Sequence, residues 1–128
     1  MNIRIEKQAL RIRMELEELK NFAKTGLTSL KVQFGGDHAQ KLCFYLQQDS
    51  QFQLRSETTP NGFEIYVSIV SVDVMDLLEL AVGPTHKKKL QKSYACGSDS
   101  VYGVNRIDFE VDVFTLRSHI NQGTDSTL

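Results

Sequence analysis

The sequence predicts an α+β fold, a mostly antiparallel sheet or barrel of about eight strands with two short helices. Two patterns predict this class. In most segments apolar and polar residues alternate with a period of two, which is typical of strands that bury one face. In two segments the apolar residues instead recur at helical spacing. A chain of 128 residues that is 41% hydrophobic and 24% charged is expected to form one domain with its own core.

The first half of the chain is predicted to run strand, strand, helix, strand, strand. These elements cover residues 2–6, 10–14, 16–25, 30–34 and 41–47. The helix has acidic residues in its first turn and Lys24 in its last, an arrangement that suits the helix dipole. Gly26 is a natural residue to follow the helix end, because glycine tolerates the positive φ that such an end requires.

The second half repeats this order with a longer insertion. Strands are predicted over residues 52–57, 63–69 and 106–116. The first two strands are joined by a tight turn that ends at Gly62. Ser71 or Asp73 can cap a helix that ends at Gly83. Residues 85–100 are expected to form a polar, irregular loop.

The shared order predicts a ββαββ internal duplication within a single domain, residues 1–128. The pseudo-repeats cover about residues 1–48 and 52–117. Direct residue identity between them is low, so an α+β domain with hairpins and helices of unrelated origin stays open. Residues 118–128 are small and polar and are expected to form a flexible tail.

The apolar side of each predicted strand and helix defines the expected core. It comprises Ile3, Ile5, Leu10, Ile12, Leu19, Phe22, Val32, Phe34, Phe44, Phe63, Ile65, Val67, Leu77, Phe109 and Val111.

Charge and cysteine content narrow the functional class. The formal net charge is −1, which does not demand a polyanionic partner or a charged membrane surface. No apolar run approaches the length of a membrane span, and charged residues interrupt any secretory signal near the start, so we expect no membrane association and a cytoplasmic protein. Cys43 and Cys96 are far apart and are expected to be free thiols.

The opening carries three local motifs: Ile3-Arg4-Ile5, Leu10-Arg11-Ile12-Arg13 and Phe22-Ala23-Lys24-Thr25-Gly26. Together they resemble the start of a family of small uncharacterised bacterial proteins. Further matches lie at Phe34-Gly35, Leu42 through Leu46, Phe63 to Val67, Glu110 and Asp112. The loop from Lys87 to Asp99 departs from that pattern. The resemblance implies a shared fold and no activity.

A second resemblance is to the swapped-hairpin fold of AbrB-type bacterial regulators. It is carried by the strand, strand, helix, strand, strand order and by the arginines of the first hairpin. No diagnostic motif accompanies it. This resemblance implies a DNA-binding function.

Two rows of opposite charge are predicted on strand faces: Arg4, Arg11 and Arg13 on the first hairpin, and Asp108, Glu110 and Asp112 on the last strand. Cross-strand ion pairing between these rows is the favoured interpretation. It would help to set the strand register if the last strand lies beside the first hairpin. A metal site built on the carboxylates is the alternative, and it would need further ligands from another strand.

The same three arginines could instead contact nucleic acid or another partner. Lys7 lies at the tip of their hairpin, and a second basic cluster comprises Lys87, Lys88 and Lys89. Glutamates near the first hairpin dilute its positive field, and nucleic-acid binding usually needs several phosphate contacts. Nucleic acid is therefore considered as a partner but not favoured.

Other common chemistries lack their motifs. His38, His86 and His119 have no zinc-ligand spacing, and Cys96 has no nucleophile signature around it. Gly35-Gly36 is a turn rather than a phosphate-binding loop. We therefore predict no catalytic residue, no cofactor and no metal.

The sequence favours a non-enzymatic binding or assembly module that can form a homodimer through an exposed strand or hairpin. Two alternatives stay open: a swapped-hairpin DNA-binding regulator, and a small ligand- or metal-binding domain or enzyme that uses the carboxylates of the last strand.

Overall fold

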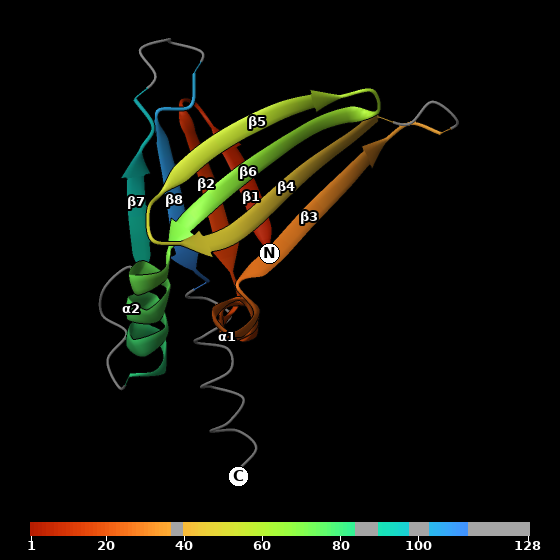
Figure 1. The fold of residues 1–128 in the computed structure, drawn as a ribbon. Coiled ribbons are helices and arrows are strands. Elements are labelled where there is room, and N and C mark those ends of the chain that lie inside the picture. The colour runs from red at the N-terminus through yellow and green to blue at the C-terminus, as the bar shows by residue number, and fades with distance from the viewer. Residues whose placement is uncertain (37–39, 84–89, 98–102, 113–128) are drawn as a thin grey trace. The chain divides into compact units, whose positions relative to one another are not determined.

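The computed structural model describes residues 1–36, 40–83, 90–97 and 103–112. Its elements, shown in Figure 1, are β1 (Asn2–Glu6), β2 (Ala9–Met14), α1 (Leu16–Thr25), β3 (Leu27–Phe34), β4 (Gln40–Asp49), β5 (Gln53–Thr59), β6 (Gly62–Val70), α2 (Ser71–Val82), β7 (Gln91–Ala95) and β8 (Arg106–Val111). This content of eight strands and two helices confirms the predicted α+β class. The predicted tail, residues 118–128, lies outside the described residues.

The strands form two four-stranded mixed sheets, with the orders β1-β2-β8-β7 and β3-β4-β6-β5. In each sheet, antiparallel hairpins flank one central parallel pair, β2 with β8 and β4 with β6. A barrel requires its first and last strands to pair with each other. Here β1 and β7 are edges of one sheet, and β3 and β5 are edges of the other. The barrel alternative is therefore wrong, and the two sheets are open.

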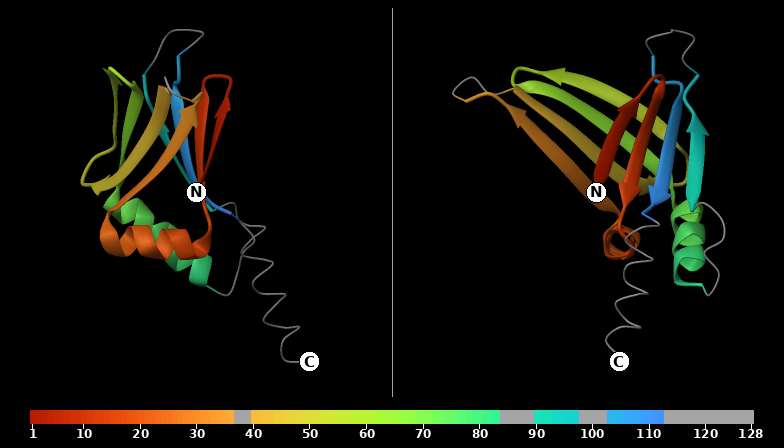
Figure 2. Two further views of the ribbon diagram at one scale, coloured as in Figure 1. Left: turned by 90° about the vertical axis from the view of Figure 1, so that its right-hand side faces the viewer. Right: turned by 180° about the vertical axis from the view of Figure 1, so that it is seen from behind.

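The ββαββ order occurs twice, as β1-β2-α1-β3-β4 and β5-β6-α2-β7-β8. Each sheet takes one hairpin from each half of the chain. The chain accordingly divides into two compact units: residues 1–20 with the described residues from 75 onward, and residues 21–74. Figure 2 shows the sheet of the first unit from behind, with β2 and β8 between the edge strands β1 and β7.

Strand β7 lies inside the segment that was expected to be an irregular loop. Its sequence, QKSYA, does not alternate apolar and polar residues, so no local signal predicts a strand. The strand forms because β8 supplies an antiparallel partner, which places Tyr94 opposite Ile107 and Ser93 opposite Asp108. The loop prediction is wrong over these five residues because tertiary pairing overrides local preference.

In the first unit, the apolar faces of β2 and β8 lie side by side in register. The pairs are Leu10 with Ile107, Ile12 with Phe109, and Met14 with Val111. All six side chains are buried. Strand β8 therefore contributes a continuous apolar row, as its alternation predicts.

In the second unit, the matching rows join β4 to β6. They pair Leu42 with Phe63, Phe44 with Ile65, and Leu46 with Val67. Helix α1 reaches this unit at its C-terminal end. There the backbone N–H of Gly26, at a φ of 79°, donates to the carbonyl of Phe22 at 2.8 Å. The side-chain amide of Gln48 donates a hydrogen bond to the same carbonyl at 2.7 Å. The predicted helix end at Gly26 is confirmed.

The expected core is correct in the middle of the sheets and wrong near their margins. The confirmed buried residues are Leu10, Ile12, Leu19, Phe22, Phe44, Val67, Leu77, Phe109 and Val111. Ile3 and Ile65 are half-buried. Ile5, Val32, Phe34 and Phe63 are exposed. The first three lie on the edge strands β1 and β3, and Phe63 lies at the start of β6 beside the turn. Alternation identifies a face, but it does not tell where along the sheet that face is covered.

Among the helices that the structure describes, none combines the length and apolar character needed to cross a membrane.

The turn before β6 yields a stability prediction. Gly62 has a φ of 156°, and a Cβ atom built there would overlap the carbonyl oxygen of Lys41 and lie 2.7 Å from its backbone nitrogen. Backbone atoms cannot move aside without disturbing the β4–β6 pairing. We expect Gly62→Ala to lower the free energy of unfolding by about 2–3 kcal/mol in urea denaturation.

Gly36 is the matched control for this substitution. A Cβ atom there meets nothing within 4 Å, so Gly36→Ala should change stability by less than about 0.5 kcal/mol. Equal stability of the two variants would contradict the close approach of β4 to Gly62.

Candidate functional site

The strand register gathers charged residues on one face of the first sheet, which we call the arginine face. It comprises Asn2, Arg4, Glu6, Arg11, Arg13, Gln91, Ser93, Arg106, Asp108 and Glu110. The register places them in rows across the strands: Arg4 opposite Arg11, Arg11 opposite Asp108, and Asp108 opposite Ser93. The next row runs Asn2, Arg13, Glu110, Gln91. Because side chains alternate along a strand, all of these residues lie on the side of the sheet that faces away from its buried apolar side.

Asp108 is the most enclosed charge on this face, with 1% of its side chain exposed. It accepts a hydrogen bond from Ser93 Oγ at 2.7 Å. Its carboxylate lies 3.1 Å from Arg106 Nε and 3.6 Å from Arg11 Nε. Buried carboxylates are tolerated when they are both ion-paired and hydrogen-bonded, and Asp108 is both.

Glu110 is nearly as buried, with 3% of its side chain exposed. Its Oε1 atom accepts a hydrogen bond from Arg13 Nε at 2.8 Å. Its Oε2 atom is buried and has no hydrogen-bond partner within the described part of the chain. One oxygen of the Glu110 carboxylate is therefore hydrogen-bonded to Arg13, and the other is left without a hydrogen bond in this part of the chain.

Arg4 and Arg11 face each other directly across the β1–β2 hairpin. Like charges in this position oppose strand pairing. Glu6 lies between them, but its carboxylate is 3.9 Å from Arg4 and 3.6 Å from Arg11, and neither contact is a hydrogen bond. Arg11 Nε has no hydrogen-bond partner among the residues that the structure describes. The guanidinium groups of this pair are only loosely neutralised.

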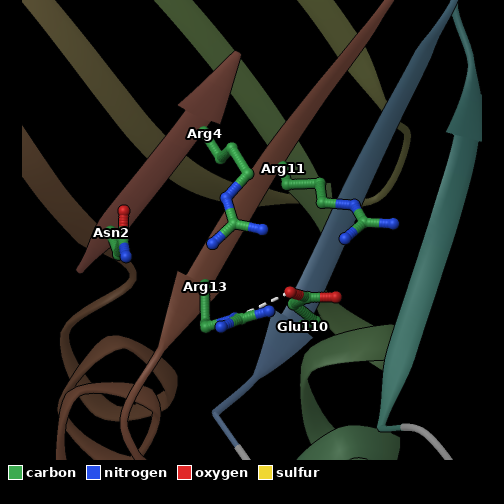
Figure 3. Close-up of a pocket in the computed structure, with 5 residues that line it drawn as sticks. All are labelled: Asn2, Arg4, Arg11, Arg13 and Glu110. Carbon is green, nitrogen blue, oxygen red and sulfur yellow. Dashed lines mark hydrogen bonds and ion pairs between the residues drawn. The ribbon is translucent and has the colours of Figure 1, made fainter. Parts of the chain in front are cut away.

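On the arginine face the negative charges lie deeper than the positive ones. Both carboxylates of β8 are buried, whereas Arg11 and Arg13 are partly exposed and Arg4 is 55% exposed. Figure 3 shows the guanidinium groups of these three arginines gathered around Glu110. The exposed part of this face is consequently cationic, although the charges on this part of the sheet nearly balance.

A small hollow lies between Asn2, the three arginines and Glu110 (Figure 3). Its volume is about 10 Å³. That space holds roughly one water molecule. The hollow can therefore admit one atom of a bound group, and an organic substrate would have to lie on the surface above it.

The structure brings together half of the ten residues predicted for this site. Arg11 pairs with Asp108 and Arg13 pairs with Glu110, so the favoured cross-strand pairing between the two rows is observed for these four residues. Each acid pairs with an arginine of the neighbouring parallel strand. Arg4 lies on β1, one strand further away, and pairs with Glu6.

The remaining predicted residues lie elsewhere or are not described. Lys7 is exposed in the turn between β1 and β2. Asp112 follows the end of β8, where its backbone N–H donates to the carbonyl of Met14 at 2.8 Å. The cluster Lys87–Lys89 lies outside the described residues. In the described ranges, no group of three or more histidine, cysteine, aspartate or glutamate side chains is placed to bind a metal ion.

The cysteines and histidines add no reactive centre to the arginine face. Cys43 is a free thiol, as predicted, and is buried on β4. Cys96 is half-buried, and burial raises the pKa of its thiol. A raised pKa lowers the thiolate fraction, which is unfavourable for a nucleophile. His38, His86 and His119 lie outside the described residues.

Sequence reasoning missed several members of the face. Arg106 continues the alternation of Asp108 and Glu110 by one step, so the pattern R-x-D-x-E could have revealed it. Ser93 and Gln91 could not be found this way, because β7 has no strand signal of its own. Asn2 carries no charge and was predicted only as a strand residue.

A second polar surface lies on the other sheet. Tyr45 and Tyr66 stack with ring centroids 5.0 Å apart and an angle of 19° between their planes. The guanidinium carbon of Arg55 lies 4.1 Å from the centre of the Tyr66 ring, and Lys31 Nζ lies 5.9 Å from that of Tyr45. A hollow of about 380 Å³ borders these rings and Gln47. We call this stack of two tyrosines and two flanking cations the tyrosine ladder. Its ring faces are already covered by each other and by the cations, which favours a structural role over a surface on which a ligand could stack.

The geometry defines the class as a two-sheet α+β protein with a cationic sheet face. The chain belongs to a family of unknown function (DUF7009), whose model matches residues 1–96. The match includes Arg4, Arg11 and Arg13 but ends before β8, the strand that carries their carboxylate partners. No curated protein and no solved structure matches the chain. The predicted kinship with an uncharacterised family is thus confirmed, while its bacterial origin and the AbrB resemblance stay predictions.

The Arg13–Glu110 pair can be tested by a double-mutant cycle. Arg13→Met alone leaves a buried carboxylate without its cation and should lower the free energy of unfolding by about 3 kcal/mol. Arg13→Met/Glu110→Met removes the charge as well and should recover to within about 1 kcal/mol of wild type. Urea denaturation of Arg13→Met, Glu110→Met and the double variant measures the coupling between the two side chains. Additive losses in the double variant would contradict the pairing.

The tyrosine ladder predicts an alkaline titration. The hydrogen bond from the Tyr66 hydroxyl to Glu64, at 2.6 Å, is the main cause that raises the pKa of Tyr66 to about 12. Because the neutral phenol is favoured in the folded state, its contribution to stability is present below the unfolded pKa of 10.0 and is lost as pH rises towards 12. Tyrosinate absorbance should show a group that titrates near pH 12 and that is absent in Tyr66→Phe. In Glu64→Gln the pKa should fall towards 10; an unchanged titration there would contradict this cause.

Proposed function

We propose that this protein is a binding module without catalytic chemistry of its own, and that its arginine face binds an anionic group of a partner molecule. The observation that carries the proposal is the separation of charge by depth. The carboxylates of Asp108 and Glu110 are buried, whereas the side chains of the arginines that pair with them are partly exposed.

The paired arrangement of Arg4 and Arg11 supports an anion as the partner. Two guanidinium groups opposed across a hairpin cost stability unless an anion lies near both. Glu6 approaches both arginines only at ion-pair distances of 3.6–3.9 Å. A phosphate or carboxylate group placed above the hairpin would accept hydrogen bonds from the guanidinium groups of both arginines. Such charge-assisted hydrogen bonds are stronger than those between neutral groups.

The contacts of the buried acids suggest that they position the arginines and do not bind a metal ion. Asp108 is already bonded to Ser93 and paired with Arg106, so its oxygens have little capacity left for a metal ion. This arrangement favours the binding module over the metal-binding alternative from the sequence.

The swapped-hairpin DNA-binding alternative uses the same arginines. DNA binding draws its affinity from many phosphate contacts, each of which needs a cation that is not already neutralised. Arg13 is hydrogen-bonded to Glu110, and Arg11 lies between two carboxylates. We therefore favour recognition of a single anionic group over an extended phosphate backbone. Homodimerisation and a cytoplasmic location stay predictions of the sequence.

Thermal unfolding with inorganic phosphate tests the proposal. At low ionic strength, phosphate should stabilise the wild-type protein more than chloride of equal ionic strength, by about 1.4 kcal/mol when its concentration is ten times Kd. Arg4→Gln should remove this stabilisation, because Arg4 is the most exposed of the three arginines around the hollow. A mixed-sequence DNA duplex is the second probe.

Arg55→Gln is the matched control. Arg55 is 55% exposed, as Arg4 is, and also has a glutamate partner, Glu57, but it lies on the other sheet. Its replacement should leave the phosphate effect intact. The proposal fails if phosphate has no effect beyond ionic strength or if both variants lose it equally. Binding of DNA alone, lost in Arg4→Gln, would favour the DNA-binding alternative.

A further inference from the structure

Strand β3 is an unusual edge strand. It spans eight residues, Leu27–Phe34, and pairs along its whole length with β4 on one side. Its other side is an edge of the sheet. Proteins usually protect such edges with prolines, several charges, bulges or short strands. This strand contains no proline or glycine, and Lys31 is its one charged residue.

The apolar face of the second sheet runs up to this edge. Val32, Leu42 and Phe63 form one cross-strand row, and Leu30, Phe44 and Ile65 form the next. Phe44 is buried, but Val32 and Phe63 are exposed, as is Phe34 beyond them. The rows therefore become more exposed towards β3 and the turn end of the sheet.

The other edge of the same sheet differs in chemistry. Strand β5 carries Arg55 and Glu57, which form an ion pair, and its residues opposite the apolar row of β6 include Ser56 and Thr58. Charged and hydroxyl side chains are typical of an edge that stays solvated. The contrast identifies β3 as the edge of this sheet that is suited to pairing.

We propose that two copies of this chain associate through antiparallel pairing of their β3 strands, with Val32 opposite Val32 of the second copy. This register places Leu30 opposite Phe34 and Lys31 opposite Gln33, so that apolar residues meet apolar residues and no like charges face each other. A register centred on Lys31 would oppose two ammonium groups, which is destabilising. A register centred on Leu30 would leave Phe34 opposite Gly26, without an apolar partner.

A second copy fits this edge better than an unrelated strand. The strand is self-complementary about Val32, as a twofold interface requires. Pairing would join two four-stranded sheets into one of eight strands and would extend the apolar rows across the junction. The inference is independent of the proposed anion binding, because it uses residues of the other sheet.

Light scattering after size-exclusion chromatography tests the interface. The wild-type chain should show the mass of a dimer, and Val32→Lys should show that of a monomer, since it would oppose two buried ammonium groups. Leu54→Lys on β5 is the matched control, because Leu54 and Val32 are both 37% exposed and lie on the same face of the sheet. It should remain a dimer. Circular dichroism establishes that both variants are folded.

A cysteine variant tests the register. Residues directly opposite each other in antiparallel strands have Cβ atoms about 4.5–5.5 Å apart, close enough for a disulfide after a small adjustment. Val32→Cys should form a covalent dimer on mild oxidation, whereas Leu54→Cys and the wild type should not. A monomeric wild type at high concentration, a dimer that persists in Val32→Lys, or equal cross-linking of the two cysteine variants would overturn the proposal.

Discussion

The parallel pairing of β2 with β8 is the interaction on which the first unit depends. It joins residues 97 positions apart in the chain, as in the pair Arg13–Glu110. Closing a loop of that length costs about 4 kcal/mol beyond a constant term. Partly exposed ion pairs contribute at most about 1 kcal/mol each, whereas each buried apolar side chain contributes about 1.5–3 kcal/mol. The apolar rows shared by the two strands, rather than the charges, therefore hold β8 in place.

The charges act on the register instead. A shift of one residue would exchange the core face for the arginine face on every strand position, which burial forbids. A shift of two residues keeps the apolar rows and must be opposed by something else. In one direction it would place Arg11 opposite Arg106. In the other it would place Asp108 opposite Ala9, so that this carboxylate would lose its cross-strand partner Arg11 and keep only Arg106 of its own strand. The observed register is the one in which each acid meets a cation.

This division of roles explains what the sequence could predict. Period-two alternation identified the strand faces, helical spacing identified both helices, and Gly26 marked the end of the first helix, because all three are properties of the local sequence. It also placed the arginine and carboxylate rows on faces that could meet. It did not identify β7, since QKSYA becomes a strand only through its pairing with β8. Nor did it identify the exposure of Ile5, Val32 and Phe34, because the edge position of a strand is a property of the whole sheet and not of its residues. Ser93 and Gln91 were not predicted as members of the candidate site because they lie on β7, the strand that the sequence did not reveal.

The buried acids also limit how the arginine face can work. Taking a carboxylate out of water costs several kcal/mol, and an ion pair seldom returns more than that cost. Asp108 and Glu110 are therefore a poor means of stabilising the sheet and an effective means of orienting guanidinium groups. Arg13 donates a hydrogen bond to the carboxylate of Glu110, and Arg106 donates one to that of Asp108. Arg4 has no such anchor and is the most exposed of the three arginines around the hollow (Figure 3). The proposed anion binding would use this arrangement, because two anchored arginines lie on the same face as Arg4, which in the described part of the chain is held only by a 3.9 Å ion pair with Glu6 and could move without repacking the core.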